Sequence, residues 1–181
     1  ASYNSSLVAN GKTITVNSFV LAGAQKDNYN LTTASATTTG NITKKDITLA
    51  LNAAPVITKV YDGTTAATLV TANYTLNTFV AGDDVSVTGT AVYDSKNAGV
   101  NKVITVNNLV LSGAQKDNYN LTTTSQTTTG TISPKAITAS TAAVTKVYDG
   151  TTNASVSFNA FTTADGLVGS DDLHVVFTTA S

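Results

Sequence analysis

The chain contains no cysteine, methionine, tryptophan, glutamate or arginine, and His174 is its single histidine. Without Cys there is no disulfide framework, no thiolate metal site and no cysteine nucleophile. All basic side chains are lysines, the net charge is -1, and no basic stripe is present that would neutralise the phosphates of a nucleic acid. No apolar run is long enough to span a bilayer. We therefore expect no cofactor, no nucleic-acid partner and no membrane span.

What the sequence does contain is a repeat. The string GAQKDNYNLTT occurs at Gly23–Thr33 and again at Gly113–Thr123, and TKVYDGTT occurs at Thr58–Thr65 and again at Thr145–Thr152. The spacing of about 90 residues is roughly that of one β-sandwich domain. One module is therefore repeated along the chain.

The repeat is out of phase with the ends of the chain. Residues 1–48 correspond to the back half of a repeat, residues 49–138 to a complete repeat, and residues 139–181 to the front half of the next. Because there is no methionine, we expect the chain to be a segment of a larger protein. Three origins stay open at this point: subunits that polymerise, one period of a longer continuous chain, or a trimmed piece with frayed ends.

The residue pattern predicts strands and turns. Thr and Val are abundant, and β-branched residues favour strands over helices. Alternation with a period of two places Val85 and Val87 on one face and Ser86 and Thr88 on the other. We therefore expect an all-β protein made of tandem antiparallel β-sandwich (Ig-like) repeat modules of about 90 residues. In the complete repeat the strands are expected near residues 56–61, 67–71, 74–80, 84–93, 102–107, 109–112, 119–125 and 130–140.

Three blocks in the same order resemble the YDG-type repeat domain: TKVYDGTT at Thr58–Thr65, NYNL at Asn118–Leu121 and GTISPKAIT at Gly130–Thr138. Such domains occur in tandem in very large secreted bacterial proteins, including filamentous-haemagglutinin-like adhesins. The resemblance implies a β-sandwich spacer module on the cell surface, and it supplies no catalytic residues. The first copy departs from the pattern at Lys44–Asp46, which leaves the start of that strand open.

The YDG motif itself invites a functional interpretation, because Asp62–Gly63 recurs as Asp149–Gly150 beside a Tyr. We interpret both pairs as structural turns. Asp accepts hydrogen bonds from the backbone N–H groups that follow it, and Gly adopts a positive φ.

Adjacent acidic residues are candidates for a calcium site: Asp83 with Asp84, and Asp171 with Asp172. Calcium takes six to eight oxygen ligands, so two neighbouring carboxylates are too few, and we expect no metal site. His174 lies in an alternating strand pattern without an acidic partner, which indicates a solvent-facing residue rather than a catalytic base.

A lysine–asparagine crosslink is a further candidate. Lys59 and Lys146 stand at equivalent positions, and Asn120 is a conceivable partner, with Asp117 as the acid. Such a crosslink requires three polar groups buried together, whereas a surface lysine on an edge strand requires none. We therefore regard the surface lysine as the better interpretation.

Each terminal piece carries the apolar residues of half a module. Alone, each would expose an apolar face and unpaired strand edges, so we expect neighbouring copies to complement each other head to tail. This predicts a structural module of a bacterial surface or secreted fibre, an adhesin or biofilm component, located outside the cell and reaching host surfaces through other parts of its parent protein. An alternative is a glycan-binding β-sandwich module, since exposed tyrosines can stack on sugar rings. We expect no enzyme, because no nucleophile–base pair can be assembled. The tyrosines considered for sugar stacking are Tyr3, Tyr29, Tyr61, Tyr93, Tyr119 and Tyr148.

Overall fold

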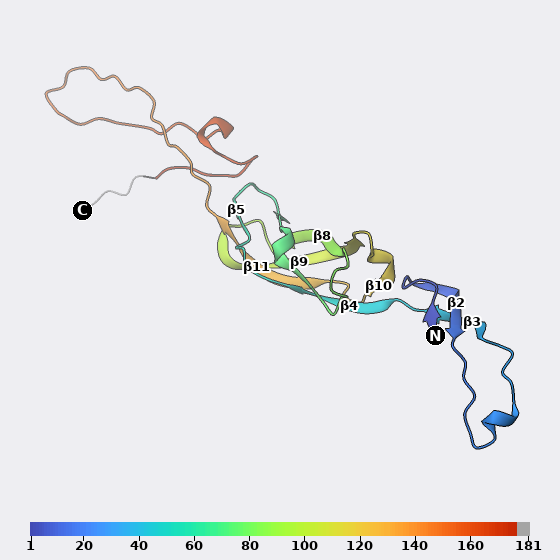
Figure 1. Ribbon diagram of the computed structural model, residues 1–181. Helices are drawn as coiled ribbons and strands as arrows, with labels where there is room; N and C mark the ends of the chain where they lie inside the picture. The colour runs from blue at the N-terminus through green and yellow to red at the C-terminus, as the bar shows by residue number, and fades with distance from the viewer. Residues whose placement is uncertain (177–181) are drawn as a thin grey trace. The chain divides into compact units, whose positions relative to one another are not determined.

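A computed structural model describes residues 1–176, and all of the regular structure in that range is strand or short 3-10 helix (Figure 1). The all-β prediction is confirmed. Among the described residues no helix has the length and apolar character needed to cross a membrane. The strands are β1 (Ser2–Tyr3), β2 (Ala9–Asn17), β3 (Ser35–Ile42), β4 (Lys45–Leu51), β5 (Thr58–Val60), β6 (Ala66–Ala67), β7 (Tyr74–Asn77), β8 (Ser86–Tyr93), β9 (Gly99–Ser112), β10 (Tyr119–Leu121) and β11 (Gln126–Ser133). The 3-10 helices are η1 (Lys26–Asn28), η2 (Thr71–Asn73), η3 (Lys116–Asn118) and η4 (Thr163–Asp165).

The strands form three sheets. Their orders are β1-β2-β3, β10-β4-β7 and β5-β11-β9-β8-β6. The β10–β4 and β5–β11 ladders are parallel, so the antiparallel arrangement expected from the sequence does not hold at these two ladders. Parallel pairing requires a long connection, and the stretch between β5 and β11 holds five further strands.

Two compact units are distinguished along the chain, and they do not coincide with the repeat boundaries. The first comprises residues 1–52, 71–90 and 107–126. Its core is formed by apolar side chains on alternate positions of the strands, as the period-two pattern predicts. The buried apolar residues are Ile47, Leu49, Val87 and Tyr119. The buried amide of Asn73 donates a hydrogen bond to the carbonyl oxygen of Asn52 over 3.0 Å.

The second unit comprises residues 53–70, 91–106 and 127–181. Ile104 and Val106 alternate along β9 and are fully buried, because that face of the strand is turned away from solvent. The sequence predicted two strands here, separated at Asn108. The structure has one continuous strand in which Asn108 has a positive φ of 52°. The other buried apolar residues of this unit are Ile57, Ala91, Tyr93 and Ile132.

Residues 134–176 hold little regular structure. The strand pairing in this stretch is the isolated bridge between Thr141 and Phe158. The η4 turn is closed by a capping box, in which Thr162 and Asp165 each bond the backbone of the other. His174 is exposed, in agreement with its interpretation as a solvent-facing residue. This front half of a repeat therefore has local turns but lacks a sheet of its own among its described residues.

Candidate functional site

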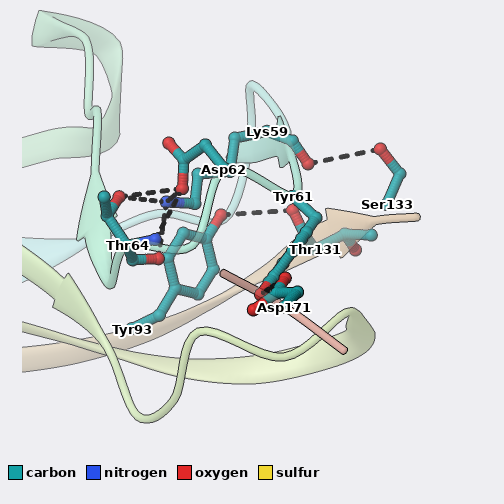
Figure 2. A network of polar contacts seen from close by, with 8 residues as sticks. All are labelled: Lys59, Tyr61, Asp62, Thr64, Tyr93, Thr131, Ser133 and Asp171. Atoms are coloured by element: carbon teal, nitrogen blue, oxygen red, sulfur yellow. Dashed lines mark hydrogen bonds and ion pairs between the residues drawn. The ribbon is translucent and has the colours of Figure 1, made fainter. Parts of the chain in front are cut away.

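The YDG motif forms a turn held by one lysine. Figure 2 shows Lys59, Asp62 and Thr64 pointing toward one another. The Lys59 ammonium donates to Asp62 Oδ1 over 2.7 Å and to the Thr64 carbonyl oxygen over 2.8 Å. The Thr64 backbone N–H donates to Asp62 Oδ1 over 2.9 Å, and Gly63 has a φ of 78°. The hydrogen bond from Lys59 lowers the pKa of Asp62 to about 2.

The second copy of the motif repeats this turn. Lys146 lies 2.8 Å from Asp149 Oδ1, the Thr151 N–H donates to the same oxygen over 2.9 Å, and Gly150 has a φ of 74°. The hydrogen bond from Lys146 lowers the pKa of Asp149 as well. The lysine side chain is 17% exposed in the first copy and 39% exposed in the second. The local sequence therefore builds the turn, and the surroundings decide how far it is covered.

In the complete repeat, the strand before the turn lies against β11. Thr131 N–H donates to the Ile57 carbonyl oxygen over 2.9 Å, and Tyr61 N–H donates to the Ser133 carbonyl oxygen over 2.9 Å. The Lys59 ammonium lies 5.9 Å from the centre of the Tyr93 ring, within the range of a cation–π contact. The turn is thus attached to the sheet through its preceding strand.

The tyrosine of the motif reaches into the next repeat. Tyr61 Oη donates to Asp171 Oδ2 over 2.6 Å, and this hydrogen bond, with burial, raises the pKa of Tyr61 (Figure 2). A cavity of about 440 Å³ lies beside the contact. It is lined by Pro134 and Ile137 of the complete repeat and by Leu167 and Asp171 of the next repeat. Residues of two successive sequence repeats therefore meet at this cavity, which we call the second junction.

An equivalent junction occurs one repeat earlier. A cavity of about 330 Å³ is lined by Val8 and Ile42 from the first partial repeat and by Asp83 and Tyr119 from the complete repeat. Tyr119 Oη donates to Asp83 Oδ2, and the Val8 N–H donates to Asn118 Oδ1 over 3.0 Å. Burial, followed by this bond to Asp83, raises the pKa of Tyr119. We call this cavity the first junction.

The acidic pairs act as hydrogen-bond acceptors at these junctions. Asp84 Oδ2 accepts from the Ala114 N–H over 3.0 Å, and Asp83 and Asp171 accept from tyrosines. Asp172 is exposed. No group of three or more His, Asp, Glu or Cys residues is gathered within residues 1–176.

The two crosslink candidates from the complete repeat have separate partners. Lys59 bonds Asp62 and Thr64, whereas the Asn120 amide donates to Asp46 Oδ1 over 2.7 Å. Sequence reasoning had treated the acidic pairs as metal candidates and missed their contacts with tyrosine hydroxyls. The available signal was the recurrence of Tyr in both repeated strings together with a recurring Asp-Asp pair.

An all-β chain whose repeats meet at two equivalent junctions belongs to the class of tandem repeat proteins. Residues 43–129 and 133–181 match the family model of the YDG domain, and the two matches begin 90 residues apart. The chain belongs to the YDG domain family. No curated protein and no solved structure matches it.

Proposed function

We propose that the chain is a structural repeat module of a long bacterial surface or secreted fibre, of the adhesin type, in which each repeat completes its neighbour. One comparison supports this proposal. Tyr93 and Tyr119 of the complete repeat are each 3% exposed, whereas their equivalents Tyr3 and Tyr29 are 41% and 73% exposed. The same side chains need a second layer to be buried, and that layer belongs to another module.

The junctions supply the second argument. Each junction uses residues from two successive repeats. The hydrogen bond across the first junction runs from the Val8 N–H to Asn118 Oδ1, and the one across the second runs from Tyr61 Oη to Asp171 Oδ2. Contacts of this kind limit how far one module can turn against the next. They suit a spacer that holds a distant part of a protein away from the cell surface.

The extracellular location is part of the same proposal. It is supported by the resemblance to YDG-type repeat domains, which implies a secreted bacterial protein, and by a cysteine-free composition rich in Thr, Asn and Ser. The carboxylates and lysines of the two YDG turns are occupied by local bonds, which favours a mechanical role over a chemical one.

Glycan binding is the weaker alternative. The most exposed tyrosines are Tyr29 and Tyr148, and their equivalents in the complete repeat are Tyr119 and Tyr61. Both equivalents donate their hydroxyl groups to aspartates at the junctions. Their exposure in the partial repeats is therefore explained by missing neighbours, without a sugar.

The proposal is tested with head-to-tail fusions of one, two and three copies of the chain. Small-angle scattering and electron microscopy should show a maximum dimension that grows by an equal step with each copy. Amide exchange in residues 1–48 of an internal copy should slow to the rates of the equivalent residues of the complete repeat. Fusions that collapse into compact particles, or that keep fast exchange at the seams, would refute the proposal.

A further inference from the structure

The two copies of GAQKDNYNLTT fold alike but have different surroundings. Both contain a 3-10 helix, η1 and η3, and the preceding Gln25 and Gln115 have φ values of -103° and -101°. Gly23 and Gly113 both have a positive φ, of 109° and 102°. The loop conformation is therefore a property of the string itself.

Only the second loop is anchored among the described residues. A Cβ placed on Gly113 would lie 2.3 Å from the Asp84 carbonyl oxygen, and the Gln115 side chain accepts from the Asp84 N–H over 2.8 Å. Nothing within residues 1–176 lies within 4 Å of the same position on Gly23. The residue equivalent to Asp84 in the next sequence repeat is Asp172, which is exposed. The Asp84 carboxylate also accepts from the Ala114 N–H of the second loop over 3.0 Å, so the equivalent N–H of Ala24 in the first loop is where an aspartate of a neighbouring copy would bind.

The strand β3 also lacks, among the described residues, the neighbouring strand that its equivalent β11 has. In the complete repeat, β11 pairs in parallel with β5, with Thr131 opposite Thr58, Ile132 opposite Lys59 and Ser133 opposite Val60. β3 is the equivalent of β11, and its sheet order ends at β3 within the described part of the chain. Its backbone edge is therefore open to strand addition.

A glycine stands at the equivalent position of both strands, Gly130 in β11 and Gly40 in β3. A Cβ on Gly130 would lie 2.6 Å from the Ile57 carbonyl oxygen of the neighbouring strand, 2.7 Å from Ile104 Cδ1 and 2.9 Å from Tyr93 Oη. At Gly40 the equivalent isoleucine and tyrosine atoms lie at 2.7 and 2.8 Å, but no carbonyl oxygen is among the nearest atoms. The close approach that glycine permits is used in the complete repeat and unused at β3.

The segment that would fill this edge is present later in the chain. Val144–Gly150 repeats the sequence of Ile57–Gly63 with a single change, Ile to Val at its first position. Its YDG turn is already formed, yet Val147 and Tyr148 are 89% and 93% exposed. This segment is the equivalent of β5. Its turn forms as in the complete repeat, but no partner strand equivalent to β11 lies beside it among the described residues.

We infer that the open edge of β3 receives residues Thr145–Val147 of a second copy of this chain as a parallel strand, while Asp172 of that copy anchors the loop at Gly23. By analogy with β5 and β11, Asn41 lies opposite Thr145, Ile42 opposite Lys146 and Thr43 opposite Val147. The ammonium of Lys146 then lies over the Tyr3 ring. This inference rests on the proposed function and names the surface through which copies join.

A second copy is favoured over the chain's own segment by the order of the parts. In the complete repeat the added strand precedes the strand that receives it, as Thr58–Val60 precedes Thr131–Ser133. Within one copy the order is reversed, and the whole complete repeat stands between β3 and Thr145. Head-to-tail pairing of two copies restores the order of the module. An open contact of this type continues from copy to copy.

The pairing is tested by disulfide formation, since the chain has no cysteine of its own. Thr43→Cys is made in an unlabelled copy and Val147→Cys in a copy carrying a heavy isotope. Mixing the two under mild oxidation should give a disulfide that joins a light and a heavy peptide. Ser133→Cys with Val60→Cys in one chain is the positive control, because those residues are opposite each other in the complete repeat.

The register is tested by a shifted pair, Thr43→Cys with Thr145→Cys. We expect its yield to be several-fold lower than that of the matched pair. Equal yields would overturn the register. To test whether the strand comes from a second copy, Thr43→Cys and Val147→Cys are placed together in one chain. Light and heavy preparations of this double variant are then mixed. Disulfides confined to peptides of one label would overturn the role of a second copy.

The aspartate anchor is tested in the same assay. Asp172→Ala in the donating copy should slow the matched disulfide several-fold, whereas Asp27→Ala in the receiving copy should leave it unchanged. If Asp172→Ala left the rate of disulfide formation unchanged, the proposed anchor at Gly23 would be wrong. Fusions that elongate without a matched disulfide would overturn this inference alone. A matched disulfide with fusions that collapse would support it and refute the fibre.

Discussion

Residues 91–133 and residues 1–43 are two copies of the same half-module in different surroundings. In the complete copy, Ile104, Val106 and Tyr119 are buried. In the partial copy, their equivalents Ile14 and Val16 are half-buried and Tyr29 is exposed. Three strands and the 3-10 helix form in both, as β8, β9, β11 and η3 in the complete copy and as β1, β2, β3 and η1 in the partial copy, whereas β10 has no counterpart at residues 29–31. Most of the local structure therefore follows from the local sequence, whereas the burial of these side chains and the strand β10 differ between the two copies.

The same contrast separates the two YDG turns. Each closes through a lysine–aspartate contact of 2.7 or 2.8 Å. Only the first is preceded by a paired strand within the described residues. A turn stabilised by residues three positions apart does not depend on the sheet, whereas the strand before it does.

The largest expected effect is the loss of a core side chain. Ile104→Ala should destabilise the complete repeat by about 2–5 kcal/mol, because the cavity it leaves is enclosed on all sides. Ile14→Ala should cost clearly less, because Ile14 is only half-buried. Hydrogen exchange of β8, β9 and β2 amides in the two variants gives both values. Equal losses would contradict the difference in packing between the copies.

Much of the complete repeat follows from the alternation of its residues, and its parallel ladders do not. Val85 and Val87 are predicted to share one face of a strand, and in the structure Val87 is buried and Val85 is half-buried. The β5–β11 pairing joins segments far apart in sequence, and no tight turn connects them that would predict the pairing. The partner of Tyr119, Asp83, is equally distant, so no local signal connects them. Long-range pairing is decided by the packing of the whole module.

The next effect concerns the glycine that opens the repeated loop. Gly113→Ala places a methyl group against the Asp84 carbonyl oxygen and at a positive φ, which together should cost about 1–3 kcal/mol. Gly23→Ala has the same φ penalty but no clash within the described residues, so it should cost about 1 kcal/mol. The exchange rates of Ala114 and Ala24 amides measure the difference. A Gly23→Ala loss as large as that of Gly113→Ala would mean that the first loop is already covered.

A smaller effect is expected at the junction tyrosine. Tyr119→Phe removes a hydrogen bond to Asp83 and another accepted from the Val80 N–H over 2.9 Å. Each bond contributes about 0.5–1.5 kcal/mol, and more when the acceptor is charged. Tyr29→Phe should be nearly neutral in the single copy, because Tyr29 is exposed. In the two-copy fusion, Tyr29→Phe of the second copy should become destabilising. Amide exchange of β3 in increasing urea, measured in the single copy and in the fusion, tests this change.

The smallest effect is the titration of the two YDG turns, and it tests whether the turn is local. The pKa of Asp62 lies at about 2, below its ordinary value of 3.8. Ionised Asp62 therefore stabilises the folded turn fully above a pH of about 4, and this contribution is lost as the pH falls through about 2. The pKa of Asp149 is lowered for the same reason, the hydrogen bond from Lys146. Carboxyl shifts measured by NMR should show both residues titrating below the ordinary range. Lys59→Ala should raise the pKa of Asp62 alone, and Lys146→Ala should raise the pKa of Asp149 alone. If Asp149 titrated normally while Asp62 did not, the turn would depend on the paired strand, and the separation of local structure from packing would fail.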